Sequence, residues 1–154
     1  MGYEALLLNT TGGANTANGS AALISNTTGN QNTANGFNAL QFNKIGAANT
    51  ANGTSALMNN AKGNNNTALG ASAGANLTTG NNNIDIGANV LGTAGESGKI
   101  RIGKQGTQNG TFIAGIFGVT MTGSPVVVNS SGKLGVSGTS SIRFKKAVKR
   151  AFRQ

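Results

Sequence analysis

Few residues in this chain have side chains suited to chemistry. Among its 154 residues there is no histidine and no cysteine, and only three are acidic, which leaves little from which to build an active site. Asp85 and Glu96 lie eleven positions apart and could contribute to a Ca²⁺ site, but Ca²⁺ takes six or more oxygen ligands. The favoured interpretation is a solvated salt bridge from these carboxylates to Arg101 or Lys99, with no metal, no cofactor and no enzymatic activity.

A column of threonines is the second candidate. Thr16, Thr33, Thr50 and Thr67 recur at intervals of 17 residues. In a solenoid such a column forms a ladder, which either orders water, as in ice-binding proteins, or stabilises the coil through contacts between stacked side chains. Stacking is the favoured interpretation, because each repeat offers one threonine rather than a pair.

The elements that position these residues are six 17-residue repeats. "NTANG" occurs three times, and "NTALG" and "NIDIG" continue the register. Further columns hold Gly19, Gly36, Gly53, Gly70 and Gly87; Ala5, Ala22, Ala39, Ala56 and Ala73; Leu6, Leu23, Leu40 and Leu57; and Asn9, Asn26, Asn43 and Asn60. A fixed short period without helical spacing is typical of a solenoid whose coils pack only on their neighbours.

The predicted coil has two short strands and two tight turns. Glycine and asparagine are expected to supply left-handed conformations at the corners, and alanine and leucine to point inward. At about 4.8 Å per stacked strand, the six coils form a rod roughly 30 Å long. In the last coil, "NIDIG" and "KIRIG" alternate apolar and charged residues, which predicts a larger and better-packed closing layer.

The sequence divides into three parts. Residues 1–103 are the repeat region, 104–139 a strand and hairpin region, and 140–154 a basic tail. Strands are predicted at 111–119 and 125–129, with a hairpin turn through 130–132. The tail places Phe144, Val148 and Phe152 on one face of a possible helix.

Charge and hydropathy narrow the possible partners. The net charge is +9, but six of the twelve basic residues lie in the last twelve positions, so nucleic acid is not an expected partner of the rod. The tail itself could bind a phosphate backbone or an anionic membrane. The favoured interpretation is instead that the tail is the first helix of a domain whose remainder is absent from this sequence. No apolar run is long enough to cross a bilayer, and the start lacks a signal-peptide pattern. Because Met1 falls within a repeat, the chain is expected to be a piece of something longer.

The repeat columns resemble the heads of trimeric autotransporter adhesins. The likeness extends through "NIDIGANVLGTAGESGKIRIG", "FIAGIFG" and "VVVNSSGKLG", in the order found in a bacterial and phage group of such proteins. It implies an all-β fold, namely a left-handed parallel β-roll (a β-solenoid) of 17-residue coils, followed by a β-hairpin region. It also implies a homotrimer outside the cell, on a bacterial surface or a phage tail, that attaches to a surface ligand or acts as a fibre spacer. The alternative is a monomeric ice- or surface-binding β-solenoid.

The end of the chain resembles the start of an endosialidase-type intramolecular chaperone. That family cleaves itself at the serine opening "SS-RFK", which corresponds to Ser140, with Lys145 as the motif lysine. Ser141 stands where the family usually has aspartate, and the chaperone body does not follow. A lysine acts as base only when a fold desolvates it, so self-cleavage is not expected.

Overall fold

The computed structural model describes residues 2–111, 113, 126–130 and 133–136. The chain divides into two compact units, Met1–Gln108 and Asn109–Gln154. The repeats lie in the first unit. The strand predicted at 111–119, the possible helix of the tail and the residues Ser140 and Lys145 lie outside the described residues, apart from Thr111 and Ile113.

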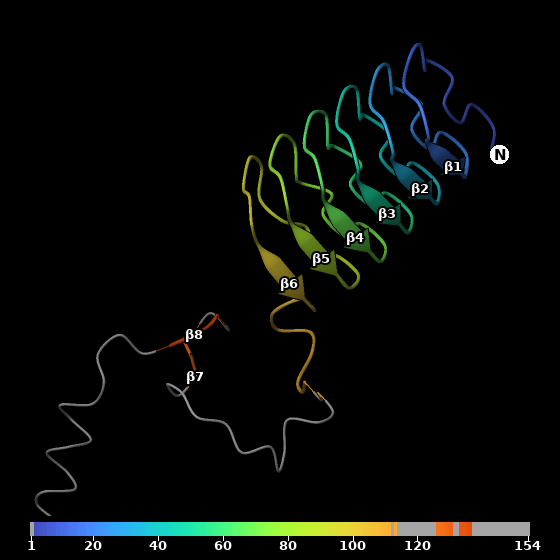
Figure 1. The fold of residues 1–154 in the computed structure, drawn as a ribbon. Helices are drawn as coiled ribbons and strands as arrows, with labels where there is room; N and C mark the ends of the chain where they lie inside the picture. The colour runs from blue at the N-terminus through green and yellow to red at the C-terminus, as the bar shows by residue number, and fades with distance from the viewer. Residues whose placement is uncertain (1, 112, 114–125, 131–132, 137–154) are drawn as a thin grey trace, which may run out of the picture. The chain divides into compact units, whose positions relative to one another are not determined.

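Six parallel strands form one sheet in chain order (Figure 1). They are β1 (Thr16–Asn18), β2 (Thr33–Asn35), β3 (Thr50–Asn52), β4 (Thr67–Leu69), β5 (Ile84–Ile86) and β6 (Ile100–Ile102). Residues 17 apart are partners from β1 to β5, as in Thr16 with Thr33, and the last step is one residue shorter, pairing Ile84 with Ile100. The predicted parallel β-solenoid of 17-residue coils is therefore confirmed.

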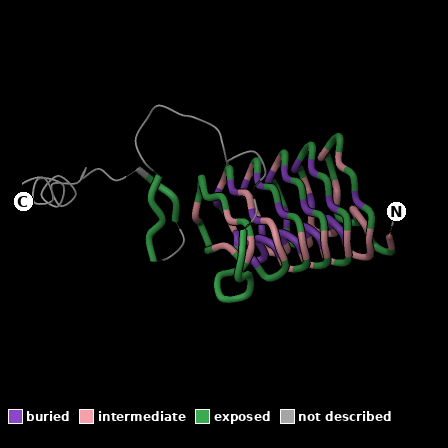
Figure 2. The backbone as a smooth tube through the Cα atoms, turned by 90° about the horizontal axis from the view of Figure 1, so that it is seen from below, coloured by how far each residue is buried: buried purple, intermediate pink, exposed green. Residues whose placement is uncertain are grey.

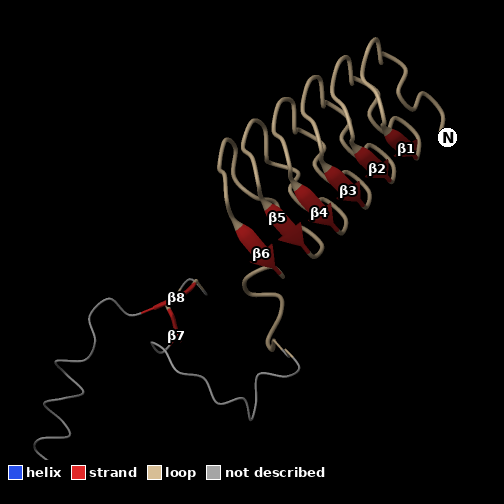
Figure 3. Ribbon diagram, viewed as in Figure 1, coloured by secondary structure: helices blue, strands red, loops and turns tan. Residues whose placement is uncertain are grey.

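Each coil contains one strand, so the prediction of two was wrong. The described residues hold strands, turns and loops and no helix (Figure 3). The side of the coil opposite the strand is a run of overlapping turns: Ala22 N donates to Gly19 O at 3.3 Å and Asn26 N to Leu23 O at 3.0 Å. Between them, Leu23 N donates to Ala39 O of the next coil at 3.0 Å. Turn and stacking bonds thus alternate and satisfy the backbone without a second strand.

These turns require left-handed residues, and leucine and alanine provide several of them. Ala21 and Leu23 have φ of 56° and 53°, at the third position of their turns, where a type II turn needs positive φ and favours glycine or asparagine. The prediction that glycine and asparagine hold the corners was correct for Gly19, at φ 143°, but wrong for the leucine column. Stacking therefore holds L-residues in a conformation that costs about 1 kcal/mol or more per residue.

Ala48→Gly is expected to stabilise the protein by roughly 0.5 to 1 kcal/mol. Ala48 is exposed and has φ of 55°, a conformation that glycine adopts without penalty. Ala47, its neighbour, does not have positive φ, so Ala47→Gly is expected to destabilise by a similar amount. Urea unfolding of both variants measures the difference. Equal destabilisation by the two substitutions would contradict the assignment of strain to position 48.

The core is built mostly of small side chains. The buried residues recur in every coil of the rod (Figure 2). As predicted, the alanine and leucine columns point inward, and the middle residue of each strand from β1 to β5 is also buried. The buried residues include Ala34, Ala51, Ala68, Ala22, Ala39, Ala56, Ala73, Leu23, Leu40 and Leu57. Alanine buries little apolar surface, so hydrogen bonds between coils must supply much of the specificity.

Two ladders of buried asparagines supply these bonds. In the first, Asn26 Nδ2 donates to Asn9 Oδ1 at 2.7 Å and Asn43 Nδ2 to Asn26 Oδ1 at 2.8 Å. The same Nδ2 groups reach a glycine carbonyl three residues on, as Asn43 does to Gly46 O at 3.0 Å. The asparagines of this ladder therefore do not supply left-handed corners, although Asn38, Asn65, Asn82 and Asn89 do so elsewhere in the coils. The ladder asparagines bind each coil to the next.

The second ladder contains Asn15, Asn32, Asn49, Asn66 and Asn83. Asn49 Nδ2 donates to Gly63 O at 2.8 Å, and Asn49 Oδ1 accepts from Asn66 N at 3.0 Å. Each side chain thus satisfies one acceptor and one donor of the following coil's backbone.

The second unit contains the predicted hairpin. Strands β7 (Val126–Val128) and β8 (Leu134–Val136) are antiparallel, with Val126 opposite Val136. Asn129 N donates to Lys133 O at 3.1 Å, and Lys133 N to Asn129 Oδ1 at 2.9 Å. The turn residues 131–132 lie outside the described residues.

Candidate functional site

The outer face of the sheet carries two parallel columns of side chains. In β1 to β4 the first and third residues of each strand are exposed and the middle one is buried. The predicted threonine column, Thr16, Thr33, Thr50 and Thr67, is therefore exposed and in register. Asn18, Asn35 and Asn52 form the second column, in which Asn18 Nδ2 donates to Asn35 Oδ1 at 3.3 Å. Across β1, β2 and β3 each coil presents one hydroxyl beside one amide, rather than two threonines.

The same face becomes aliphatic towards β6. We call Leu69, Ile84, Ile86, Ile100 and Ile102 the aliphatic patch. Ile100 and Ile102 are 69% and 73% exposed, Leu69 is exposed, and the β5 isoleucines are half-buried. The expectation of a better-packed closing layer was thus wrong, because these isoleucines face outward and the charged residues between them face inward. An alternating pattern does not reveal which of its faces is buried.

A group of charged residues, one fully buried and two partly exposed, lies on the inner side of the sheet at this end of the rod. Asp85 takes the inward position that Ala68 holds one coil earlier, and Arg101 takes it one coil later. Arg101 Nη1 lies 3.5 Å from Asp85 Oδ1, and both Nη atoms contact the Glu96 carboxylate at 2.5 Å. We call these three residues the inward charge cluster. The predicted salt bridge to Arg101 is present, but Asp85 is fully buried rather than solvated.

The two carboxyl groups of the cluster have opposite pKa shifts. Burial raises the pKa of Asp85 above its ordinary value, although Arg101 partly offsets this. Burial also acts on Glu96, but hydrogen bonds from Arg101 and from Thr93 N outweigh it and lower the pKa of Glu96. Among the described residues, Asp85 Oδ2 is buried without a hydrogen-bond partner. At this end of the rod, a proton therefore binds most readily to Asp85.

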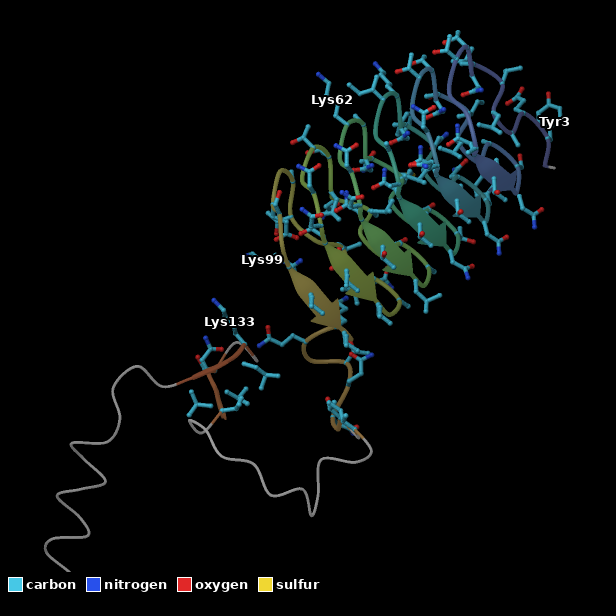
Figure 4. All side chains as sticks on the ribbon, in the orientation of Figure 1. Tyr3, Lys62, Lys99 and Lys133 are labelled. Carbon is cyan, nitrogen blue, oxygen red and sulfur yellow. The ribbon has the colours of Figure 1, made fainter. Side chains whose placement is uncertain are left out.

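Further apolar side chains are exposed on the first and third coils. They are Tyr3, Leu7, Leu8, Phe37, Phe42 and Ile45. Tyr3 lies at the N-terminal end of the rod in Figure 4, whereas Lys62 and Lys99 project from separate coils. These apolar positions are not evident from the repeat pattern, because each repeat fills them with different residues.

The described residues contain no group of three metal-ligating histidine, cysteine or acidic side chains, and no helix long and apolar enough to cross a membrane. Comparison with family models, curated proteins and solved structures finds no match to this chain. The geometry of the rod and the motifs of the sequence are therefore the basis for a functional proposal.

Proposed function

We propose that this chain is a structural and adhesive segment of a homotrimeric extracellular fibre, of the bacterial surface adhesin or phage tail-fibre kind. The observation that carries the proposal is the aliphatic patch on β4, β5 and β6. Contiguous exposed aliphatic side chains on a soluble surface mark places where another molecule docks. Three copies of the rod, packed through this patch, would remove it from water. The trimeric stoichiometry comes from the resemblance to adhesin heads.

The polar columns of the same face support the adhesive part of the proposal. Thr16, Thr33 and Thr50, beside Asn18, Asn35 and Asn52, present hydroxyl and amide groups at a constant interval along the rod. Such groups bind polar surface ligands through hydrogen bonds, and where no ligand is met the rod acts as a spacer. The alternative, a monomeric ice- or surface-binding solenoid, uses the same threonines.

Light scattering on a size-exclusion column at several concentrations tests the proposal. The expected mass is that of three chains. The double variant Ile100→Thr/Ile102→Asn gives β6 the outward residues of β1, β2 and β3, and is expected to raise the concentration needed for association at least about tenfold, equivalent to roughly 1.4 kcal/mol. Leu7→Gln/Leu8→Gln removes two exposed leucines outside the patch and is the matched control. It should leave the mass unchanged.

A monomer at all concentrations would overturn the trimer. Thermal hysteresis of that monomer, lost in Thr33→Val/Thr50→Val, would then establish the ice-binding alternative.

A further inference from the structure

The inward charge cluster joins the last coil to the coil before it. Asp85 belongs to β5, Arg101 to β6 and Glu96 to the loop between them. Arg101 is paired with Glu96 on two atoms and with Asp85 on one, so Glu96 takes the larger share of the guanidinium. Glu96 is itself held by Thr93 N, at 2.7 Å from Oε1. Asp85 is thus the weakly held member of the cluster.

Asp85 Oδ2, the oxygen without a hydrogen-bond partner, lies beside uncharged residues. A Cβ atom added to Gly92 would lie 3.1 Å from Asp85 Oδ2, and one added to Gly74 would lie 3.4 Å from it. The same two positions approach the Leu77 side chain, so Gly74, Gly92 and Leu77 lie beside this oxygen. Arg101 and Glu96 are the charged groups that act on Asp85, and Lys99 acts on Glu96. A carboxylate in this place lacks the water that would stabilise its charge.

We propose that Asp85 is a proton-operated latch that sets how firmly the last coil docks on the rod, and so whether β6 presents Ile100 and Ile102 in the aliphatic patch. The two isoleucines flank Arg101 on a three-residue strand, so they keep their places only while Arg101 keeps its own. The effect of Asp85 on the docking of the last coil concerns one chain alone. Its effect on the aliphatic patch, and so on association, rests on the proposed function.

The direction of the pH dependence follows from the two carboxyl groups. The pKa of Asp85 is raised in the folded chain, so its ionised form weakens docking, and the penalty disappears as the pH falls through that pKa towards the ordinary value of about 3.9. The pKa of Glu96 is lowered, so its contribution holds in mild acid and is lost only when the pH falls through its folded pKa. The last coil therefore docks most firmly in mild acid, and less firmly at neutral pH and in strong acid.

Amide hydrogen exchange, corrected for its intrinsic pH dependence, tests the latch. The reporters are Ile84 N, which donates to Lys99 O at 2.8 Å, and Gly103 N, which donates to Ile86 O at 2.7 Å. The internal control is Thr50 N, which donates to Asn66 O in the middle of the rod at 2.8 Å. Between neutral pH and mild acid, protection of the reporters relative to Thr50 is expected to rise about tenfold for each pH unit by which the Asp85 pKa is raised.

Two variants isolate Asp85 from other titrating groups. Asp85→Asn keeps the shape and cannot ionise, so the rise in protection is expected to vanish. Glu4→Gln removes an exposed carboxyl group from the first coil and should leave the rise unchanged. Reporter protection that is independent of pH in the natural chain, or a pH dependence that survives in Asp85→Asn, would overturn the latch.

The exchange experiment is repeated in Ile100→Thr/Ile102→Asn, which keeps the cluster but lacks the β6 part of the patch. A pH-dependent rise in reporter protection in this variant, together with no trimer of the natural chain by light scattering, would contradict the proposed function and support the latch. Trimers whose stability is the same in the natural chain and Asp85→Asn at all pH values would instead overturn the link between latch and patch.

Discussion

Gly46→Ala is expected to lower the free energy of unfolding by roughly 3 to 5 kcal/mol, the sum of overpacking and disrupted buried hydrogen bonds. Gly46 is buried between the two asparagine ladders. A Cβ atom there would overlap the carbonyl oxygen of Gly63 and Oδ1 of Asn43, and would lie 3.1 Å from Asn60 Nδ2. Backbone on one side and laddered amides on the other leave no direction in which the methyl group can move.

Gly13→Ala is the matched control for this substitution. Gly13 is exposed and lies one position further along its coil, and the nearest atom to an added Cβ is Asn30 Oδ1 at 3.6 Å. Neither glycine has positive φ, so the two variants differ in space rather than in backbone strain. Urea unfolding followed by circular dichroism measures both. A loss below about 1 kcal/mol for Gly46→Ala would show that the coils separate easily, contrary to the tight stacking described above.

Asn49→Ala is expected to cost roughly 2 to 4 kcal/mol, because it leaves one buried backbone N–H without a partner at about 1 to 3 kcal/mol and also opens a small void. That group is Asn66 N, which loses the 3.0 Å bond to Asn49 Oδ1, whereas Gly63 O loses the 2.8 Å bond from Asn49 Nδ2 but keeps the 3.0 Å bond from Asn60 Nδ2. Asn49→Asp should also destabilise the rod, because a carboxylate accepts from Asn66 N but cannot donate to Gly63 O.

Asn35→Ala removes the same side chain from the exposed column. Asn35 Nδ2 donates to Asn52 Oδ1 at 3.3 Å, where water can replace the bond, so a change of about 0.5 kcal/mol or less is expected. The same unfolding experiment compares the two alanine variants. Similar losses in Asn35→Ala and Asn49→Ala would mean that burial does not distinguish the two asparagine columns.

The period of the sequence predicted the coil length and the parallel register. Those properties depend on the spacing between equivalent residues, which can be read directly from the repeats. The period also identified the threonine column. The salt bridge to Arg101 was expected, as one of two alternatives, from the scarcity of acidic residues, but its inward position was not. The hairpin at 126–136 followed from the turn residues between two apolar runs.

Other features depend on which side of a residue faces the core, and the pattern did not contain that information. "NIDIG" alternates in the same way whether its isoleucines or its aspartate are inside. Leu23 is a poor choice for positive φ, and only the stacking of its neighbours makes that conformation acceptable. The buried asparagines were assigned to corners because asparagine is common in turns, whereas their amides match the backbone spacing of the next coil.

The ladder from Asn15 to Asn83 fixes the register of each coil on the one before it, because an amide from one coil binds the backbone of the next. Recombination that gains or loses a whole 17-codon unit would keep every such bond in register, whereas a loss of one codon within a middle coil would disturb the bonds between that coil and its two neighbours. The length of this protein can therefore evolve in steps of one coil, about 4.8 Å each.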